Sequence, residues 1–566
     1  MTAMVLWGDS DDPGLRKARG AFFTPREICR YIAAWAIRDP RDLVLEPSCG
    51  EAEFLLAAGR RLAELGGSGD AEVGLAGVEL HPDSARCARE LMASQGFDAA
   101  IETADFLTVE PRPGFDVVIG NPPYIRYQDF AGEPRVRARE AALRAGVTLS
   151  GLASSWAAFT VHAALFLRPG GRLGLVLPAE LTTVNYAAGV RRFLLERFAE
   201  VRMVAFTERV FPGVLEEVVL LLADGFEKGP ADQLTIVQAR DVDDLDNGAE
   251  NAWTPVDPSD KWTPGLLTTD ALDVYESVVS GEAFSTLDAW GETTLGIVTG
   301  RNDYFALTEG EVGSLQLEPS DIVRVSPPGS RHLRRLDLGD DQWHELRLAR
   351  QRVYLFRPAG RPSNAGMRYV ATGEGQGVST AYKCRVRAPW WRVPYLRPAD
   401  LFLTCMNADV PQLCANSARI HHLNSVHGIY LHDGLADRGR RLLPVAALNS
   451  MTLLGAETVG RSYGGGILKI EPKEADRLPV PGPGLLAHAE HDLLAARPDV
   501  EYLLRSRRLD DAVALVDALL LVRHAGLGRA RAAAVRVARE SLQARRHARG
   551  GSNPRPRAAH LPEDAG

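Results

Sequence analysis

The amino-acid sequence predicts an α/β protein in which a doubly wound, Rossmann-like sheet is followed by an α+β module and a helical C-terminus. Three observations predict this architecture. Apolar runs alternate with helical patterns from residue 20 to about 225. The pattern becomes Gly-rich and irregular between about 285 and 480, with aromatic and basic residues mixed. Residues 485–547 are rich in Ala, Leu and Arg, as helices are.

Short apolar runs are the candidate strands of the doubly wound sheet. They are almost continuously apolar, which is typical of parallel strands buried on both faces. The runs are residues 43–45, 75–78, 116–119, 173–177 and 218–222. A further strand is expected just before Asp105.

A helix is expected directly after Thr24. Thr24, Pro25 and Glu27 fit the N-cap, N1 and N3 positions of a capping box, and an apolar helix face follows them. Good capping alone explains these residues. The other interpretation is that the exposed N-terminus of this helix holds a ligand carboxylate.

A turn with an acidic residue follows the first candidate strand. Glu46 ends that strand, and Gly50 lies in the tight turn before the next helix. Glycine lets the backbone approach a bound cofactor closely. An acidic side chain here suits a ligand amine or hydroxyl, whereas nicotinamide-binding loops carry GxGxxG for a pyrophosphate. An ordinary strand–turn–helix connection is the alternative interpretation.

Acidic residues also follow the next two strands. Glu79 is placed to accept hydrogen bonds from ribose hydroxyls, and Leu80 to pack on an adenine. Asp105 could accept from an adenine amino group, with Phe106 against the ring. Each pair taken alone also fits an ordinary surface carboxylate beside an apolar residue.

The most specific motif is Asn121-Pro122-Pro123-Tyr124, directly after the run 116–119. Two prolines fix an extended turn, and neither prolyl nitrogen can donate a hydrogen bond. The Asn121 amide oxygen and the Pro122 carbonyl remain as acceptors, and Tyr124 offers a ring for stacking. Two acceptors on an exocyclic amine reduce its conjugation with its ring and free the nitrogen lone pair. The motif therefore predicts attack by such an amine without a covalent enzyme intermediate.

The order of these motifs resembles the gamma class of DNA amino-methyltransferases, in which cofactor motifs precede the catalytic turn and a target-recognition domain follows. Residues 159–178 look like the fifth and sixth motifs of that class, and residues 210–213 look like the eighth. Further on, 296–303, 424–427 and 461–466 look like the target-recognition half of restriction-modification adenine methyltransferases. The resemblance covers roughly residues 20–480. It departs at Ala52, where the class usually has Gly.

The resemblance implies a site-specific adenine-N6 methyltransferase with S-adenosyl-L-methionine as its cofactor. The catalytic residues would be Asn121, Pro122 and Tyr124, and the flipped target base would stack on Tyr124 and Phe211. The cofactor would be bound by Thr24, Glu46, Gly50, Glu79, Leu80, Asp105, Phe106 and Asn121. No metal site is expected, because no tight cluster of Cys, His or carboxylate residues occurs in the sequence.

The expected domain organisation has five parts. A catalytic, cofactor-binding domain spans 1–240, an Asp- and Pro-rich linker 241–284, and a DNA target-recognition domain 285–480. A helical, Arg-rich segment follows over 481–550, and a disordered tail over 551–566. The segment from residue 501 to the end holds 13 Arg and no Lys against 7 acidic residues, which fits either phosphate binding or a solvated helical bundle.

The expected partner is double-stranded DNA, with a cognate restriction endonuclease as a functional partner only. The recognition sequence is not readable from the residues; the resemblance suggests a short palindrome, for which GTCGAC is the candidate. Three alternatives stay open. The same acceptor geometry serves cytosine N4, although Asn before Pro-Pro favours adenine. Protein-glutamine methyltransferases share Asn-Pro-Pro-Tyr but lack a large C-terminal half. A non-enzymatic specificity subunit would not need Glu79, Asp105 and Asn121.

The charge and the cysteine content exclude few classes of function. The net charge of −8 argues weakly against nucleic acid, but a DNA enzyme needs only a local positive face. The six scattered cysteines form no CxxC pair, which indicates reduced thiols. No apolar run is long enough for a transmembrane helix, and the N-terminus has no secretory pattern, so a cytoplasmic protein without membrane contact is expected.

Overall fold

The structure is a computed structural model that describes residues 24–66, 74–208, 210, 217–463 and 465–549. Phe211 and the tail expected over 551–566 lie outside these residues. Contacts divide the chain into two compact units, one up to Thr269 and the other from Asp270 onward. Each unit is described by itself.

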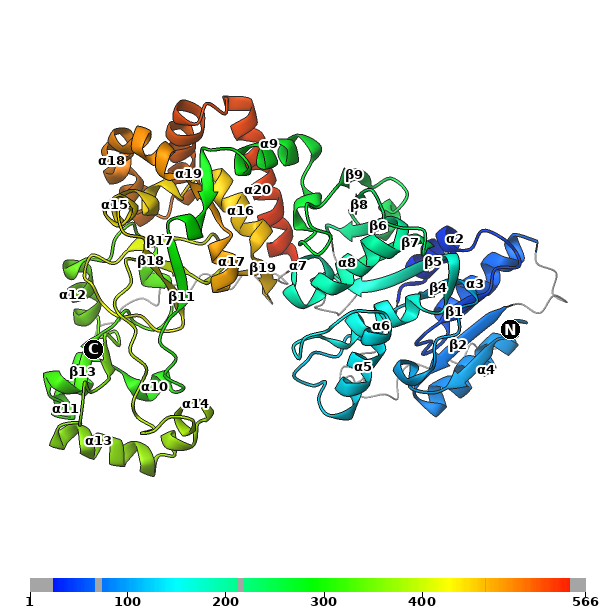
Figure 1. Ribbon diagram of the computed structural model, residues 1–566, viewed down its shortest axis with the longest axis horizontal. Helices are drawn as coiled ribbons and strands as arrows, with labels where there is room; N and C mark the ends of the chain where they lie inside the picture. Colours follow the sequence, from blue (N-terminus) through cyan, green and yellow to red (C-terminus); the bar gives the residue numbers. More distant parts are fainter. Residues whose placement is uncertain (1–23, 67–73, 209, 211–216, 464, 550–566) are drawn as a thin grey trace, which may run out of the picture. The chain divides into compact units, whose positions relative to one another are not determined.

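The first unit is built on one nine-stranded sheet within the described residues, and its order is β3-β2-β1-β4-β5-β7-β6-β8-β9 (Figure 1). Strands β4 and β7 are buried along almost their whole length, as strands covered on both faces are. The strands are β1 (Val44–Glu46), β2 (Leu75–Glu79), β3 (Ala100–Thr103), β4 (Phe115–Gly120), β5 (Leu167–Pro178), β6 (Phe198–Phe206), β7 (Val218–Phe226), β8 (Leu234–Ala239) and β9 (Ala249–Trp253).

The direction of the strands defines the doubly wound topology. The five strands from β3 to β5 run parallel, and β7 is inserted antiparallel between β5 and β6. Val44 of β1 pairs with Leu75 on one side and Val117 on the other, so the strand order reverses at β1. Ligands of such sheets bind beyond the carboxyl ends of the strands at this reversal. The expected α/β fold is confirmed.

Helices cover the sheet of the first unit. Helices α2 and α3 pack against each other and against β1, β2, β4 and β5, and α6 packs against α5, α8 and β5. The bounds are α2 (Arg26–Ala36), α3 (Glu53–Glu64), α4 (Pro82–Ser94), α5 (Glu133–Arg144), α6 (Ser155–Ala164), α7 (Glu180–Thr183) and α8 (Ala188–Arg197).

The start of α2 differs from the expected capping box. Pro25 is the N-cap residue, and no side chain caps the helix there. The Thr24 hydroxyl instead accepts a hydrogen bond from the side chain of Asn121, 97 residues along the chain. The bond from Asn121 thus uses Oγ1 of Thr24, the atom that would accept from the backbone in a capping box.

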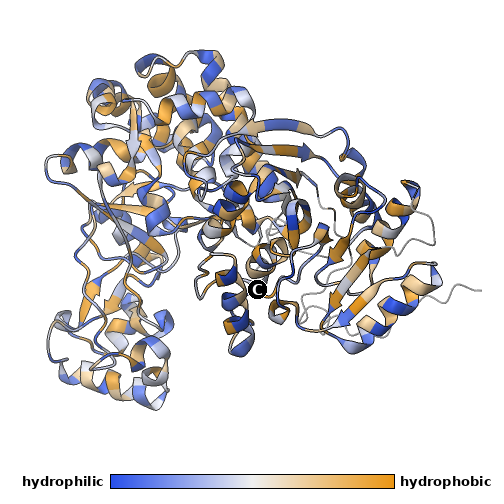
Figure 2. Ribbon diagram, turned by 45° about the vertical axis from the view of Figure 1, so that its right-hand side comes forward, coloured by the Kyte–Doolittle hydropathy of each residue, from blue (hydrophilic) through white to orange (hydrophobic). Residues whose placement is uncertain are grey.

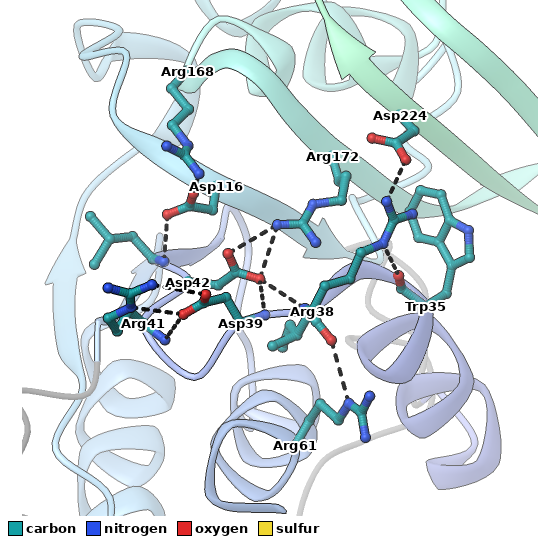
Figure 3. A network of polar contacts seen from close by, with 12 residues as sticks. Trp35, Arg38, Asp39, Arg41, Asp42, Arg61, Asp116, Arg168, Arg172 and Asp224 are labelled. Atoms are coloured by element: carbon teal, nitrogen blue, oxygen red, sulfur yellow. Dashed lines mark hydrogen bonds and ion pairs between the residues drawn. The ribbon is translucent and has the colours of Figure 1, made fainter. Parts of the chain in front are cut away.

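A polar network joins the amino ends of β1, β4 and β5, at the edge of the sheet opposite to the carboxyl ends (Figure 3). Arg172 on β5 donates from Nη2 to both carboxylate oxygens of Asp42, at 2.9 and 3.0 Å, and both side chains are buried. Asp42 also accepts from the backbone N–H groups of Arg38 and Asp39. Asp116 on β4 accepts from the Leu43 N–H at 2.9 Å. The network therefore fixes the loop that leads into β1.

Residues 241–284, expected as a linker, contain ordered structure. Strand β9 pairs antiparallel with β8 and becomes the last strand of the large sheet, and η4 (Thr263–Leu266) packs on both strands. Helix α9 (Thr269–Val279) follows. An edge strand bonds on one side only and tolerates polar residues, so the composition did not reveal it.

The second unit combines small sheets with helices (Figures 1 and 2). Its sheets, within the described residues, have the orders β11-β18-β15-β17, β12-β14-β13, β16-β20-β19 and β10-β21. The strands are β10 (Phe284–Thr286), β11 (Gly291–Leu295), β12 (Ala306–Leu307), β13 (Ile322–Arg324), β14 (Tyr354–Phe356), β15 (Leu401–Thr404), β16 (Met406–Asn407), β17 (Leu413–Ala415), β18 (Val426–Leu431), β19 (Arg461–Tyr463), β20 (Ile467–Lys469) and β21 (Pro479–Pro481). This mixture is the expected α+β arrangement.

Helices α15 to α20 complete the second unit. They are α15 (Ala436–Ala446), α16 (Ser450–Val459), α17 (Pro472–Asp476), α18 (Pro483–Arg505), α19 (Leu509–Val516) and α20 (Arg529–Arg549). Earlier in the unit lie α10 (Asn302–Phe305), α11 (Glu309–Ser314), α12 (Asp340–Leu348), α13 (Asn364–Gly375) and α14 (Tyr382–Arg385). Among the described residues no single helix is long and apolar enough to cross a membrane. The pair α15 and α16 passes by length and composition, with a bend of 90° between them.

Several arginines of the C-terminal helices are paired within the protein. Arg546 on α20 is buried and donates from Nη2 to Glu457 on α16 at 2.8 Å. Arg536 pairs with Asp517 at 3.0 Å, and Arg539 with Asp510 at 3.2 Å. Of the two interpretations for this segment, a helical bundle stabilised by its own ion pairs accounts for these arginines.

Candidate active site at the carboxyl edge of the sheet

The residues singled out in the sequence lie where β1, β2, β3 and β4 end. Glu46 is the last residue of β1 and Glu79 the last of β2. Asp105 lies two residues after the end of β3, and Asn121 comes directly after β4. Hydrogen bonds join these chain segments: the Gly50 N–H donates to Glu79 at 2.9 Å, and the Asn121 side chain donates to Thr24 at 3.0 Å.

Two carboxylates hold the loops around β1 and β2. Glu79 accepts from the N–H of Gly50 with one oxygen and from the N–H of His81 with the other, each at 2.9 Å. Glu46 accepts from the Leu55 N–H at 3.1 Å and is almost completely buried. Burial raises the pKa of Glu46 well above its usual range, and the nearby Glu79 charge adds to this rise. Neighbouring acidic groups with unused lone pairs suit a ligand that carries positive charge and hydroxyls.

Asp105 caps the short 3-10 helix η1 (Phe106–Thr108) by accepting from the Leu107 N–H at 3.1 Å. Its other oxygen lies 3.3 Å from Nη1 of Arg137, on α5. The Phe106 ring is buried and stacks on Phe159, with 5.6 Å between ring centroids. The ring assigned to a cofactor adenine therefore contacts protein side chains.

His162 on α6 fixes the same loop. Its Nε2–H donates to the carbonyls of Phe106 and Val109, at 3.2 and 3.1 Å. Burial lowers the pKa of this imidazole to about 4, so it is neutral near pH 7. The hydrogen bonds of His162 thus attach the loop after β3 to α6.

The amide of Asn121 is fixed by a partner at each end. Its Nδ2 donates to Oγ1 of Thr24 at 3.0 Å, and its Oδ1 accepts from the Tyr124 hydroxyl at 2.6 Å. The Tyr124 hydroxyl is also 2.9 Å from the carbonyl oxygen of Val176 on β5. A carbonyl-type oxygen has two lone pairs, so Oδ1 keeps a second acceptor site in a fixed direction.

The rest of the turn is held through its second proline. The Ser155 hydroxyl on α6 donates to the Pro123 carbonyl and accepts from the Ile125 N–H. No donor among the described residues hydrogen-bonds the carbonyl of Pro122. The role of this carbonyl as a second acceptor beside the Asn121 amide stays a prediction.

A small pocket lies next to this turn. It is lined by Pro47, Ser48, Gly120, Pro122, Phe159, Ala163 and Leu175. Phe159 was not singled out by itself in the sequence, because every residue of α6 is buried and the sequence of this helix shows no amphipathic periodicity. Its place in the fifth-motif segment was the available signal.

Of the two remaining predicted residues, the structure describes Leu80 but not Phe211. Leu80 is 58% exposed, unusual for a leucine beside a buried strand end, and is accessible to a ligand ring. Phe211 lies outside the described residues, and its stacking role stays a prediction. No group of three or more His, Cys, Asp or Glu residues that could hold a metal ion occurs in the described part of the chain.

Ala52, the departure from the family pattern, has a left-handed backbone with φ 63° and ψ 24° and is completely buried. This conformation costs an L-residue about 1–2 kcal/mol, which glycine avoids. We expect Ala52→Gly to leave the free energy of unfolding within about 1 kcal/mol of wild type, because relief of strain offsets the lost methyl burial.

Ala58 is the matched control, since it is equally buried but lies inside helix α3. Ala58→Gly is expected to cost about 1–2 kcal/mol from lost burial and lower helix propensity. Urea denaturation of both variants checks the difference. Equal losses in the two variants would mean that the turn stores no strain at Ala52.

The comparisons with known proteins agree with this geometry. The family model "N-6 DNA Methylase" matches residues 13–259, and the model of the C-terminal domain of Type II methyltransferase M.Eco57I matches residues 259–521. The chain therefore carries an N-6 DNA methylase domain over residues 13–259. It is an adenine-specific DNA methyltransferase whose cofactor is S-adenosylmethionine.

Relatives of this methylase match over most of its length. Type II methyltransferase M.XamI from Xanthomonas campestris pv. amaranthicola is 26% identical over 83% of this chain and 87% of its own. Type II methyltransferase M.AccI from Acinetobacter calcoaceticus is 21% identical over 89% of this chain and 93% of its own. The solved structure of the Type IIL restriction-modification enzyme MmeI in complex with DNA covers 92% of this chain and 75% of its own, with a TM-score of 0.51 and 13% identity, and so supports the fold.

The chemistry of the carboxyl edge fits this cofactor. S-adenosylmethionine carries a positive sulfonium, an ammonium group, ribose hydroxyls and an adenine. The edge holds two acidic groups, Glu46 and Glu79, which are compatible with the first three, and the exposed side chain of Leu80, which is compatible with the last. Gly50, with φ 47° and open space at its Cα, lets a ligand approach the turn.

Proposed function

We propose that this methylase transfers a methyl group to N6 of an adenine flipped out of duplex DNA at a specific sequence, and so protects host DNA from a partner restriction endonuclease. The observation that carries this proposal is the fixed amide of Asn121. Its oxygen and the Pro122 carbonyl provide two acceptors at the end of β4 for one exocyclic amine.

Asn121 acts on the amine as it attacks. An amine conjugated with a purine ring is a weak nucleophile, and acceptors that bind both of its hydrogens favour the pyramidal form. The fixed amide thus contributes more to the transition state than to the ground state. Thr24 and Tyr124 act as positioning residues, since their hydroxyls fix which face of the amide points outward.

Base flipping is required because a duplex hides the target amine. Extrusion costs a few kcal/mol, which stacking on an aromatic ring offsets. Tyr124 is the proposed stacking partner, worth about 1–3 kcal/mol, and Phe211 a second one. The Tyr124 hydroxyl donates to Asn121 and lies 2.9 Å from the Val176 carbonyl, and these contacts hold its ring in place beforehand.

The cofactor is proposed to lie along the ends of β1, β2 and β3. Glu79 would bind its ribose hydroxyls and Asp105 its adenine amine, with Leu80 on the adenine. Phe106, whose ring is buried against Phe159, would support this part of the site. Phe159 is added because it lines the pocket beside Pro122. Thr24, Glu46 and Gly50 would serve the methionine end. When bound, S-adenosylmethionine supplies the electrophilic methyl group that the amine attacks.

We assign the choice of DNA sequence to residues 285–480 and the chemistry to residues 1–240. The aromatic and basic residues concentrated in the second unit support this division. Base edges in a groove would be read there.

Long-read sequencing of host DNA, with and without this gene, tests the function. We expect N6-methyladenine in one short sequence only when the gene is present, and none when it encodes Asn121→Ala. Methylation of cytosine, or none above background, would contradict the proposal. Digestion with endonucleases that cut the identified sequence then tests protection.

Replacing Glu79 by alanine tests the cofactor site. We expect S-adenosylmethionine binding to weaken by about 1–3 kcal/mol, the usual cost of removing a charged hydrogen-bond partner. Calorimetry measures the affinity, and thermal melting separates loss of contact from loss of fold. Asp83→Ala is the control, because its side chain is exposed on α4. Unchanged affinity in both Glu79→Ala and Asp105→Ala would refute the placement.

A further inference from the structure

One segment of the second unit carries a dense positive charge that the protein does not neutralise. This basic segment, residues 357–397, contains eight Lys and Arg residues and a single acidic residue, Glu374. Glu374 accepts a hydrogen bond from the Trp390 indole at 3.0 Å rather than from a cation. Among the described residues, none of the eight cations forms an ion pair.

The cations on either side of the segment behave differently. Arg347 pairs with Glu309, and Arg352 lies 3.2 Å from Glu311. On the other side, Arg419 pairs with Asp400 at 3.0 Å. The nearest cation on each side is thus paired within the protein, whereas the eight cations of the basic segment form no ion pair with any described residue.

Six of the eight cations are exposed. They are Arg361, Arg368, Lys383, Arg385, Arg392 and Arg397. Exposed apolar side chains alternate with them: Tyr382 is 65% and Tyr395 58% exposed. Exposed aromatic rings among unpaired cations are typical of surfaces that bind nucleic acid.

Buried side chains of the same segment hold this surface rigidly. Tyr369 stacks on Tyr304 with 4.5 Å between ring centroids, and each hydroxyl donates to the other residue's carbonyl. Trp391 is buried in the same core. Arg387 donates to the carbonyls of Val298 and Thr299, at 2.7 Å each.

Two helices of the basic segment, α13 and α14, carry cations on one side and core residues on the other. Helices α13 and α14, which carry Arg368, Lys383 and Arg385, lie in the lobe formed with α10, α11 and β13 (Figure 1). Their outer sides carry cations, and their inner sides carry Tyr369 and Cys384 of the lobe core. The charges therefore stand on fixed helices and need little ordering when they bind.

We propose that the basic segment binds the phosphate backbone of the substrate duplex. The inference rests on the proposed function and adds the surface that supplies binding energy independent of sequence. Unpaired exposed arginines can displace the counterions condensed on DNA phosphates without first breaking an internal ion pair. The paired arginines of α18 to α20 would have to break one.

The test removes three cations whose side chains form no hydrogen bond or ion pair with the described residues. The triple variant Arg361→Gln, Arg368→Gln and Arg385→Gln should fold normally. The control triple variant is Arg505→Gln, Arg508→Gln and Arg523→Gln, which removes the same charge from exposed arginines that are paired with Glu501, Asp511 and Asp492.

Binding of a fluorescent 30-base-pair duplex is measured by anisotropy between 50 and 300 mM salt. The slope of log K against log salt is negative, and each lost phosphate contact makes it less steep by about 0.9. In the first variant, which lacks three cations, the slope should therefore be less steep by about 2.7. Its affinity should fall at least about tenfold on every duplex, with unchanged preference between sequences. The control variant should keep the wild-type slope.

The outcomes separate this inference from the proposed function. A wild-type slope in the first variant, an equal loss in the control, or a loss on RNA without a loss on duplex DNA would overturn the inference, while methylation by wild-type protein would still support the function. A wild-type protein that binds no duplex at any salt concentration overturns both.

Discussion

Replacing Asn121 by alanine should reduce turnover about a hundredfold or more, while duplex DNA and the cofactor still bind. The amide is preorganised by Thr24 and Tyr124, so it costs no reorganisation when the amine becomes pyramidal. Removing one such preorganised contact raises the barrier by about 3 kcal/mol or more. Single-turnover rates at saturating DNA and cofactor measure the chemical step alone.

Graded variants distinguish the amide's chemistry from its positioning. Asn121→Asp should be milder than Asn121→Ala, because a carboxylate still accepts from the amine. Tyr124→Phe keeps the ring and removes only the hydroxyl that bonds Oδ1, so about 1 kcal/mol, or roughly fivefold in rate, is expected. Near-normal turnover in Asn121→Ala would reject the whole mechanism, whereas loss of DNA binding in that variant would show a structural role instead.

The main sheet was predictable because its strands follow a rule of composition. The runs around Val44, Leu75, Val117, Leu175 and Leu220 are apolar on both faces, and all lie in strands of the large sheet. The polar residues after them could be placed at one edge by topology alone, since parallel strands end together.

Contacts between distant residues were not predictable. Thr24 fits a capping box by local sequence, but its hydroxyl bonds Asn121, and nothing near Thr24 announces that partner. Likewise the charge of the C-terminal helices suggested phosphate binding as readily as packing. Only the ion pair of Arg546 with Glu457, 89 residues apart, distinguishes the two for that residue.

Composition alone also gave wrong predictions of secondary structure in two segments. The charge, Gly and Ala of residues 135–150 are typical of a loop, yet α5 occupies most of that range, because Ala, Arg and Glu are strong helix formers. The Asp- and Pro-rich stretch after residue 240 contains β9, whose ladder bonds to β8 depend on register and not on apolar content.

Replacing Arg172 by alanine should destabilise the first unit by about 3–5 kcal/mol, since it leaves the buried Asp42 carboxylate without its cation. Asp42 would keep only its backbone donors, the N–H groups of Arg38 and Asp39. The loop into β1 should loosen, and with it the start of β4, which bonds to Leu43 (Figure 3).

Arg41→Ala is the matched control in the same network, because Arg41 and its partner Asp39 are exposed, and such pairs contribute about 0–1 kcal/mol. Amide hydrogen exchange at β1 and β4 gives the local free energy of opening in each variant. Because the network lies at the edge opposite to Asn121, Arg172→Ala should keep near-normal turnover at temperatures where it stays folded. If the free energy of opening in Arg172→Ala were no lower than in Arg41→Ala, the buried pair would contribute no more to the stability of this domain than an exposed pair does.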